Sequence, residues 1–497
     1  MAQEKSINIP RLIFGLKVRQ LRQEKGLSFA SLSELTGLSI SYLNEIEKGK
    51  KFPKEDKLNK LAQELNTTPN QLISSELEGS LEPVGDLLRS NFLDEFPLDL
   101  LGIGFNKLIE LIANSPLRFK AFISTLIDLS RSYPFFKQEN FYHAALRSYQ
   151  ELHFNYFEDI EQSVDDFVAW QCLNSDITPS VDVLREKLIQ LYDVKVLENG
   201  LENYPELQYF RCIFIAKERL LLFNKHLSIR QRTYHLAKEI GFQVLKIKER
   251  PYISSSFEVN NFEQVLNNYK AGYFAVALLI NRHRFINDLN QFFNQESWNP
   301  NFLFELMSKY QASPEVLFQR FNLLPHFFQM KKIFFMRVIH NTTLDKFEID
   351  KEIHFHRKHR PYVSNRQEHY CRRWLALAVL SELKDCGSKD DLIGIQKSKY
   401  IDINDEYLCM TIGRVGHPFP DRNVSVTVGI LLDDHVKSII KFHDDASIKV
   451  RNVNVTCERC SLSDCKERAA PPLRIEMKKE IVEVKNALER LVKDYSR

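Results

Sequence analysis

Three cysteines near the C-terminus stand close enough in the sequence to bind one common centre. Cys457, Cys460 and Cys465 follow the pattern Cys-x2-Cys-x4-Cys. Short loops between ligands cost little closure entropy, so the three thiolates can reach one point. Three sulfur ligands call for a fourth, and both zinc and an iron–sulfur cluster accept four thiolates. The spacing therefore predicts a metal centre and leaves the metal open, with a chance grouping of structural thiols as the alternative.

The other cysteines and the nearby charges bear on how such a centre is completed. The chain has eight cysteines and begins MAQEKSINIP, which contains no apolar leader segment. We therefore expect a cytoplasmic protein, in which clustered thiols bind metal more often than they form disulfides. Basic side chains at Arg459, Lys466 and Arg468 favour the thiolate form of the cysteines. The candidates for a fourth ligand are Cys172, Cys212, Cys371, Cys386, Cys409 and His369.

A second group of polar residues follows Ser39 near the N-terminus. Ser39 can cap a short helix whose apolar residues, Leu43 and Ile46, face a core. The polar side chains between them then point outward, where an asparagine such as Asn44 can pair with adenine in a major groove. Lysines after the helix are placed for phosphates. The residues predicted to contact DNA are Ser39, Ser41, Tyr42, Asn44, Glu45, Lys48, Lys50 and Lys51.

The neighbouring elements complete a helix-turn-helix unit over residues 9–73. Pro10 suits a first helical turn, Ser28 can cap a second helix, and Gly37 supplies the turn before the third. Residues 1–73 contain 12 Lys or Arg and 8 Asp or Glu, a balance of 12 − 8 = +4, whereas the whole chain carries +3. A basic head on a nearly neutral body is typical of DNA binding by the head.

A third candidate site is a helix predicted over residues 228–245. His235 and Glu239 stand four residues apart there and so share one face of the helix. Two side chains do not complete a metal site. A surface pair or a core histidine is therefore the simpler interpretation.

Outside the head, the spacing of apolar residues predicts a mixed body. The apolar period changes repeatedly between that of helices and that of strands. The predicted helical regions are 99–171, 181–192, 228–245, 260–322 and 474–495. The predicted strand regions are 194–196, 332–356 and 400–450, and an apolar run at 212–215 and the stretch 219–223 follow the first of them.

These elements predict an α+β multidomain fold, with an all-α head followed by a helical and mixed α/β sensor body. The head at 9–73 is followed by an acidic segment at 74–98 that contains Gly and Pro, which is typical of a linker. Two further domains are expected, at 99–330 and at 331–497. No run of apolar residues is long enough to span a bilayer, so no membrane segment is expected.

The head resembles the Xre/Cro-type helix-turn-helix family. The shared motifs are Leu-Arg-x-x-Lys-Gly-Leu-Ser at 21–28 and Thr-Gly-Leu-Ser-x-Ser-Tyr-Leu-Asn-x-Ile-Glu-Lys-Gly at 36–49. The resemblance implies that the third helix enters the major groove of DNA. A helical module that binds protein is the alternative.

The helix at 228–245 is similar to the zinc helix of ImmA/IrrE-type metallopeptidases, in which His-Glu-x-x-His supplies two zinc ligands and a catalytic glutamate. Aligned on Leu-Ala-x-Glu-x-Gly, the two ligand positions hold Lys238 and Phe242, and only Glu239 remains. The segment Ala271–Ile280 resembles the following helix of that family. Without two ligands no water is activated, so we expect no enzyme and a scaffold reused for sensing.

Nearly the full chain resembles the short-chain fatty acyl transcriptional regulators, long Xre-type proteins that control acetate, propionate or methylcitrate metabolism. The landmarks are the Xre-type head, Phe141–His153, the degenerate peptidase helix, Cys371-x-x-Trp374 and the cysteine motif with its Arg-Ala-x-Pro-Pro ending. The resemblance implies a 4Fe–4S cluster, with zinc as the alternative. The implied ligands are Cys371, Cys457, Cys460 and Cys465.

This chain departs from that family at two places beside the implied fourth ligand. Arg372 stands where relatives usually have proline, and residues 360–369 look like an insertion. Both differences concern the local geometry around Cys371 more than its role as a ligand.

The same resemblance implies that the body senses a short-chain acyl-CoA. Such an effector carries phosphates and an adenine, so its pocket needs cations and aromatic or apolar walls. An ordinary surface or packing role is the alternative for each candidate. The candidate residues are Arg147, Tyr149, Arg230, Arg232 and Lys238.

These observations together predict a sequence-specific DNA-binding transcription regulator. A homodimer is expected, because paired heads read half-sites about 34 Å apart. The apolar stripe of the final helix could face a partner or the chain's own body. The alternatives are a metal-dependent peptidase of ImmA/IrrE type that acts on a repressor, and an antitoxin-like module that binds DNA and protein. The large body and the cysteine group argue against the antitoxin.

Overall fold

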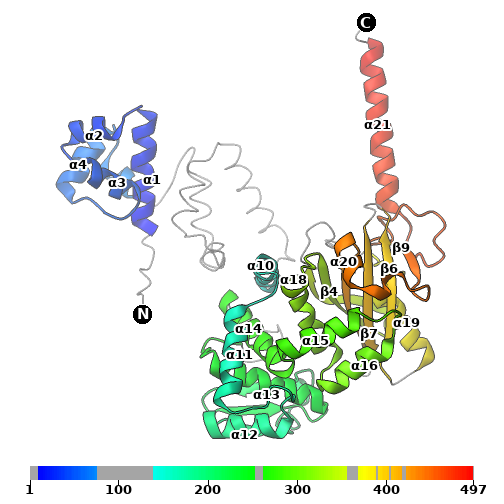
Figure 1. Ribbon diagram of the computed structural model, residues 1–497. Coiled ribbons are helices and arrows are strands. Elements are labelled where there is room, and N and C mark those ends of the chain that lie inside the picture. Colours follow the sequence, from blue (N-terminus) through cyan, green and yellow to red (C-terminus); the bar gives the residue numbers. More distant parts are fainter. Residues whose placement is uncertain are drawn as a thin grey trace. The chain divides into compact units, whose positions relative to one another are not determined.

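The computed structural model describes residues 9–74, 138–251, 261–354, 368–387, 390–401, 405–416 and 421–495. These residues belong to two compact units, Met1–Ala145 and Leu146–Arg497, and each is described by itself (Figure 1). Residues 75–137 lie outside the described residues. Nearly all of the expected linker at 74–98, and the first part of the helical region expected at 99–171, therefore lie outside them too.

The head is a bundle of short helices. They are α1 (Ile9–Glu24), α2 (Phe29–Thr36), α3 (Ile40–Glu47), α4 (Glu55–Glu64) and α5 (Pro69–Ile73). Apolar side chains from these helices meet in one core, in which Leu32 and Leu43 are completely buried. Ser28 and Ser39 cap α2 and α3 with their side-chain oxygens, as the sequence predicts. The apolar period and the caps thus give the same helix bounds.

A glycine inside α1 sets the distance between the first and third helices. A Cβ at Gly15 would lie 2.3 Å from the carbonyl oxygen of Ile46 in α3. Glycine inside a helix usually costs stability, about 0.5–1 kcal/mol relative to alanine. Here no larger residue fits, because the backbone of α3 occupies the space. Gly15 therefore allows α3 to pack directly on α1.

The first part of the body consists of helices around a small sheet. Its helices are α10 (Gln138–Leu152), α11 (Glu158–Trp170), α12 (Val181–Tyr192), η3 (Pro205–Leu207), α13 (Ile229–Val244), α14 (Phe262–Leu279), α15 (Arg282–Phe293), α16 (Pro300–Lys309), α17 (Pro314–Gln319), η4 (Arg320–Leu323) and α18 (Leu324–Phe327). The sheet has the order β1-β3-β2, made of β1 (Lys195–Leu197), β2 (Cys212–Ile215) and β3 (Leu220–Phe223). α14 is buried along most of its length and packs on α13. The predicted helix at 181–192 is confirmed to the residue, and the apolar run at 212–215 forms β2.

The second part of the body is a six-stranded sheet with the order β5-β4-β8-β7-β6-β9. The strands are β4 (Ile333–Asn341), β5 (Lys346–His354), β6 (Leu392–Tyr400), β7 (Glu406–Arg414), β8 (Arg422–Leu431) and β9 (Val450–Val453). All neighbours are antiparallel except β6 and β9, which are parallel. The prediction of a strand pair at 332–356 is confirmed by β4 and β5.

Both faces of this sheet are buried, and they face different neighbours. In β4, Ile333 and Phe335 belong to the core shared with the helical part, whereas Phe334 and Met336 belong to a second core with α19 (Leu375–Cys386). This alternation is the two-residue period of a strand. The first core is continuous across residue 330, so the domain boundary expected there falls inside one compact unit.

The region 400–450 is β-rich only in its first part. After β8 the chain forms α20 (Asp434–Ile439), which Asp433 caps, and the short helix η6 (Lys441–Asp444). The last element is α21 (Leu473–Tyr495), which extends away from the rest of the body in Figure 1. Among the described residues, no helix could span a membrane.

Candidate DNA interface and cysteine centre

The outward face of α3 is formed by the residues predicted to read DNA. Ser41 is exposed, and Asn44 and Glu45 are half-buried, whereas Leu43 and Ile46 have no exposed surface. This is the orientation that a recognition helix requires, since its inner face must pack while polar groups face a groove. Ser39 is exposed, and its side-chain oxygen already accepts a hydrogen bond from the backbone N–H of Tyr42 as the cap of α3.

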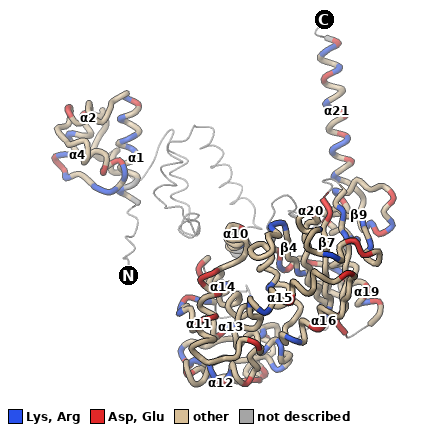
Figure 2. The backbone as a smooth tube through the Cα atoms, in the orientation of Figure 1, with Lys and Arg blue, Asp and Glu red and all other residues tan. Residues whose placement is uncertain are grey.

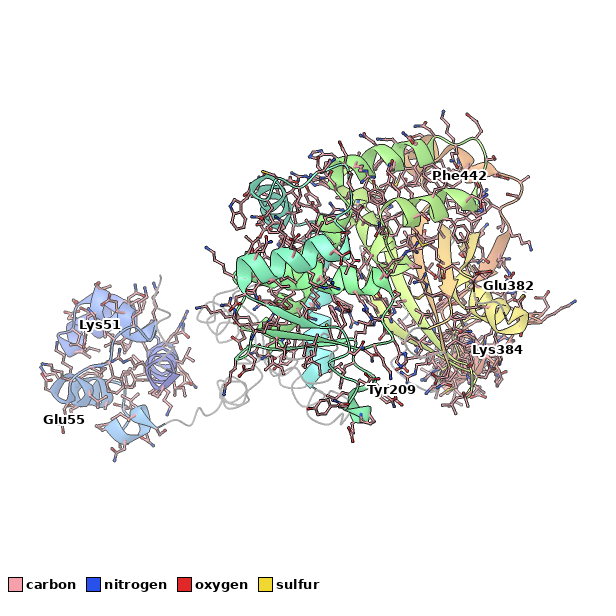
Figure 3. The ribbon with its side chains drawn as sticks, turned by 90° about the horizontal axis from the view of Figure 1, so that it is seen from below. Lys51, Glu55, Tyr209, Glu382, Lys384 and Phe442 are labelled. Carbon is pink, nitrogen blue, oxygen red and sulfur yellow. The ribbon has the colours of Figure 1, made fainter. Side chains whose placement is uncertain are left out.

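The lysines after α3 are exposed on the surface of the head. Figure 3 labels Lys51 there, and Lys48 and Lys50 are exposed as well. The Nζ of Lys51 lies 2.7 Å from Oε2 of Glu45, and this hydrogen bond lowers the pKa of the Glu45 carboxyl. Tyr42 lies below a further cation, with the Nζ of Lys57 4.8 Å from its ring centroid. Positive charge therefore gathers at the C-terminal end of α3, where phosphate contacts are expected.

A buried ion pair holds α3 in place. The guanidinium of Arg22 in α1 donates to both carboxylate oxygens of Glu47, over 2.6 and 3.0 Å. Arg22 also donates to the carbonyl oxygen of Leu27 over 2.8 Å and lies over the ring of Phe29. The side chains of the pair are only 10% and 5% exposed. The sequence does not indicate this pair, because charged residues on helices are usually exposed to solvent.

The segments that contain Cys371 and Cys457 are paired with each other. Tyr370 and Thr456 form an antiparallel bridge. The N–H of Cys371 donates to the carbonyl oxygen of Val455 over 3.2 Å, and the N–H of Cys457 donates to that of His369 over 2.9 Å. The structure thus brings the expected fourth ligand beside a cysteine motif 86 positions further along the chain (457 − 371 = 86).

The loop that carries the other cysteines is held by Arg468. Its guanidinium donates to the carbonyl oxygens of Cys457, over 2.8 Å, and Cys460, over 3.3 Å, and also to that of Leu462. The N–H of Ala469 donates to Sγ of Cys457 over 3.3 Å. Backbone donors to sulfur stabilise a ligating thiolate.

The four cysteines that the resemblance implies as ligands differ in their exposure. Cys371, Cys457 and Cys460 are buried and Cys465 is half-buried. Burial raises the pKa of the Cys371 thiol, and a bound metal would hold it as the thiolate. Within the described residues, no three Cys, His, Asp or Glu side chains are placed closely enough to hold a metal ion as they stand. The cysteine segments are therefore together, while their side chains do not yet converge.

Side-chain hydrogen bonds and ion pairs also join the segment before Cys371 to the segment around Cys457. Glu368 accepts from Thr456 Oγ1 and from the guanidinium of Arg459, both over 2.8 Å. The Nδ1 of His369 lies 2.8 Å from Oε1 of Glu458, so this candidate ligand has a carboxylate partner. Of the other candidate ligands, Cys172 and Cys386 are exposed, and burial raises the pKa of Cys409 to about 12. Cys371 and His369 both lie on the segment that is hydrogen-bonded to the segment of Cys457.

The helix that resembles a zinc helix is α13, and its polar side chains are buried. Lys238 donates to Oδ1 of Asn268 over 2.6 Å, and burial lowers its pKa to about 8. Glu239 is bound by Arg250 over 2.8 Å. His235 does not pair with Glu239: its Nδ1 lies 3.3 Å from Sγ of Cys212. The core-histidine interpretation is confirmed, and the surface pair is not formed.

The five residues expected to bind an effector are spread over the body. Tyr149 stacks on Phe157 with centroids 5.6 Å apart, and Lys238 is bound to Asn268. Arg232 donates to Glu198 and to the carbonyl oxygen of Leu227. Burial lowers the pKa of Arg230, with a further effect of the nearby positive charge of Arg414. Arg147 is half-buried in α10. Lys238 lines a small cavity together with His235 and Glu239, and none of the other four residues lines that cavity.

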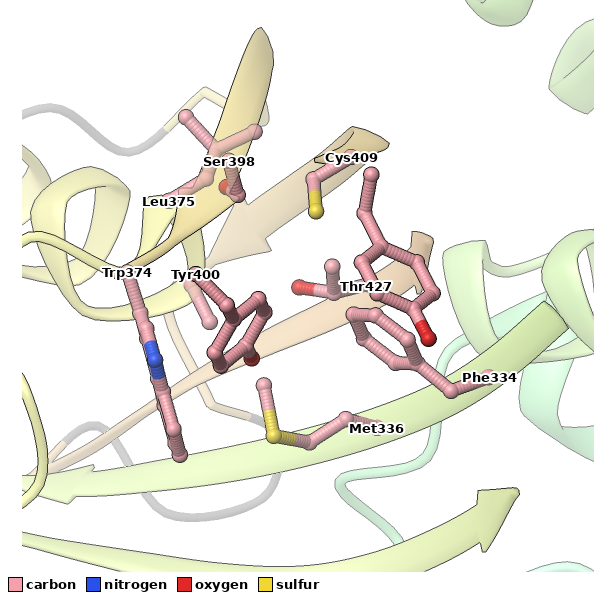
Figure 4. A pocket seen from close by; sticks show the side chains of 10 residues that line it. Phe334, Met336, Trp374, Leu375, Ser398, Tyr400, Cys409 and Thr427 are labelled. Carbon is pink, nitrogen blue, oxygen red and sulfur yellow. The ribbon is translucent and has the colours of Figure 1, made fainter. Parts of the chain in front are cut away.

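A cavity that the sequence did not reveal lies between α19 and the large sheet (Figure 4). Trp374 and Tyr400 face Phe334 and Met336 across it, and Ser398 and Thr427 add hydroxyl groups. The backbone N–H of Trp374 donates to the carbonyl oxygen of Cys371 over 3.0 Å, and its indole N–H donates to that of Asn454 over 2.8 Å. The strand alternation indicated these residues only as core. Their grouping depends on strand order, which the sequence does not reveal.

Comparison with known proteins identifies two domains. Residues 15–78 match the model of a helix-turn-helix domain, and residues 191–322 match that of the IrrE N-terminal-like domain. A Mycobacterium tuberculosis transcriptional regulator aligns with 66% of this chain and 93% of its own, at 16% identity and a TM-score of 0.46. The apo form of the competence regulator ComR from Streptococcus vestibularis aligns with 65% of this chain and 88% of its own, at 15% identity and a TM-score of 0.13. No curated protein matches the chain.

The matched head and the exposed polar face of α3 define the class of the protein. It is a DNA-binding transcription regulator, in which an Xre-type helix-turn-helix domain precedes an IrrE-like domain. The prediction of an α+β multidomain fold with a helical head is confirmed.

Proposed function

We propose that this regulator recognises a specific operator, binds a 4Fe–4S cluster on Cys371, Cys457, Cys460 and Cys465, and senses a short-chain acyl-CoA. The observation that carries the proposal is the outward polar face of α3, which a buried ion pair holds against α1. A rigid helix with polar side chains toward a groove reads base edges, and lysines beside it contact phosphates.

Substitutions on α3 are expected to separate base reading from phosphate binding. Asn44→Ala should weaken binding to the chain's own promoter about 5- to 100-fold, the range expected for one lost base contact. It should leave binding to random duplex unchanged. Lys50→Ala should weaken binding to the promoter and binding to random duplex by factors similar to each other. It should also lower the dependence of binding on salt concentration. Fluorescence anisotropy at two salt concentrations measures these effects. A wild-type protein without preference for the promoter over random duplex would contradict operator recognition.

The cysteine part of the proposal rests on the paired segments and the donor to Cys457 sulfur. Four thiolates hold an iron–sulfur cluster or zinc, and the resemblance to short-chain fatty acyl regulators favours the cluster. The cluster would add one-electron redox chemistry or a structural link at this site. The protein's own contribution is to bring the four cysteines together and to surround them with Arg373, Arg459 and Arg468.

Loss of one cysteine should remove the cluster. Anaerobically purified wild-type protein is expected to be brown, with iron and sulfide in equal amounts and broad visible absorbance. Cys457→Ala should lose most of this iron, because three thiolates bind a cluster weakly. Cys386→Ala is the matched control, since Cys386 is exposed on α19. A colourless wild-type protein with stoichiometric zinc would replace the cluster with a zinc site and leave the DNA-binding proposal intact.

The acyl-CoA part of the proposal rests on the resemblance to short-chain fatty acyl regulators. The aromatic cavity beside α19 is apolar with a few hydroxyl groups, but its volume of about 20 Å³ is that of a water site, so it would have to widen to admit an acyl chain. Trp374 contacts both this cavity and the Cys371 carbonyl, so an occupant would lie beside the cysteine segments.

The IrrE N-terminal-like match favours one other candidate function, a metal-dependent peptidase. We propose instead that this domain has no peptidase activity. The ligand positions hold Lys238 and Phe242, and the remaining Glu239 is bound by Arg250. Arg250 donates to both carboxylate oxygens of Glu239, and no ligand holds a water for this carboxylate to activate.

A further inference from the structure

Beyond its first turn, the helix α21 has no partner within the described body. From residue 476 to residue 494 every side chain of α21 is exposed. Five of its exposed apolar residues form one stripe, Met477, Ile481, Val484, Leu488 and Leu491, each between 52% and 59% exposed, whereas Leu473, Val482 and Val492 lie off this stripe. Helices in proteins gain most of their stability by packing an apolar face. The stripe on α21 therefore requires a surface to cover it.

The spacing of the stripe indicates what that surface is. The five residues follow steps of four, three, four and three, which is the heptad repeat of a coiled coil. The positions beside the stripe are mostly charged, as at Lys478, Glu480 and Lys485. A helix that packs on a globular body needs a wider apolar face than this narrow seam. The pattern fits another helix with the same repeat.

We infer that α21 forms a parallel two-stranded coiled coil with α21 of a second copy of this chain. Each heptad has two core positions, and Ile481 occupies the first of them in its heptad. In a parallel coiled coil, the residue directly before this first core position faces a residue of the other helix that stands five positions later in the sequence. Glu480 therefore faces Lys485 of the second copy, and the symmetry makes this contact twice. Figure 2 shows basic and acidic residues interspersed along α21.

An antiparallel pair would bring like charges together instead. With the seams of the two helices matched, Lys485 lies beside its own counterpart, and Glu480 lies near Asp494 of the second copy. Both contacts are repulsive. Charge complementarity therefore selects the parallel pair.

The root of α21 is fixed to the body at the cysteine loop. The N–H of Arg474 donates to the carbonyl oxygen of Glu458 over 3.0 Å, and its guanidinium contacts Glu368. A parallel pair thus joins two bodies at the same end. This inference supplies the dimer contact for the proposed reading of two half-sites, and it is tested without DNA, so that its failure is distinct from a failure of operator recognition.

A seam substitution and a neighbouring control test the inference. The full-length protein is expected to sediment at twice its chain mass of 58.4 kDa. Ile481→Asp should raise the dissociation constant at least about 100-fold, because it buries a charge in the seam. Val482→Asp is the control: both side chains are 53% exposed, but Val482 lies off the seam. Equal effects of the two substitutions would overturn the inference.

A charge reversal tests the direction of the helices. Glu480→Lys should weaken a parallel dimer about 3- to 10-fold, and adding Lys485→Glu should restore it. In an antiparallel dimer the single change would tighten association, since the introduced ammonium group would then lie near Asp494 of the second copy. A trimer, or a monomer whose melting temperature falls with Ile481→Asp, would also overturn the inference. The monomer outcome would show that α21 packs on its own chain.

Discussion

Replacing Glu47 by alanine is expected to unfold the DNA-binding head and to abolish operator binding. The change leaves Arg22 buried without its carboxylate partner, which costs about 3–5 kcal/mol when a buried pair is broken. A domain of this size has only a few kcal/mol of stability in total. Hydrogen exchange of the full-length protein, read over α1 to α3, together with promoter binding measures the effect.

Two further variants show that the lost pair is the cause. Glu45→Ala changes a half-buried glutamate of the same helix, which pairs with the exposed Lys51, and should leave the protection of α3 unchanged. Replacing Arg22 and Glu47 together by leucine should restore much of the stability, because no charge is then left unpaired. Unchanged protection of α3 in Glu47→Ala would contradict the role of the ion pair.

Arg320→Leu is expected to destabilise the body by about 3–5 kcal/mol, again because a buried charge loses its partner. Arg320 and Glu161 are 1% and 2% exposed, and one of the two hydrogen bonds that join them measures 2.9 Å. Arg320 also donates to the carbonyl oxygen of Ile280 over 2.9 Å, and Tyr273 donates to Glu161 over 2.8 Å. Chemical denaturation of the full-length protein measures the loss.

The pH dependence of stability identifies this pair specifically. Burial acts to raise the pKa of Glu161, but the charge and hydrogen bonds of Arg320 outweigh it, so the pKa is lowered. A lowered pKa in the folded state stabilises the protein above the unfolded pKa, and this stability is lost as pH falls. In Arg320→Leu burial alone should raise the pKa of Glu161. The variant should then recover stability relative to wild type between about pH 7 and pH 5.

Controls for this prediction are an exposed pair and a double substitution. Lys225→Ala removes the partner of the exposed Glu202 and should not change the melting temperature. Replacing Glu161 and Arg320 together by leucine should restore most of the stability. An equal pH dependence of wild type and Arg320→Leu would show that Glu161 does not respond to Arg320.

The head is predictable from its sequence because its determinants are local. Ser28 and Ser39 mark the starts of α2 and α3, and the apolar period fixes which faces are buried. Arg22 and Glu47 are not predictable in this way, since their pairing depends on how α1 crosses α3. Gly15 is the only sign of that close crossing that we find among these residues, and a glycine inside a helix has several possible causes.

The body shows a similar division between local and long-range features. The strands at 332–356 follow from alternation, but the parallel pairing of β9 with β6 joins segments about 50 residues apart. The cysteine motif is visible as a sequence pattern. The approach of Cys371 to it depends on the bridge between Tyr370 and Thr456, which no periodicity indicates. The resemblance to a known family named Cys371, whereas spacing alone left six candidates.

The attachment of α21 at Arg474 has a mechanical consequence. The helix has 23 residues, and at 1.5 Å per residue it is about 34 Å long. Its first turn is bonded to the backbone of Glu458, which stands directly after Cys457. A tilt of about 10° at that root would move the far end of a rod of this length by about 6 Å. A small rearrangement around the sulfur atoms would thus be amplified at a distant point of the molecule.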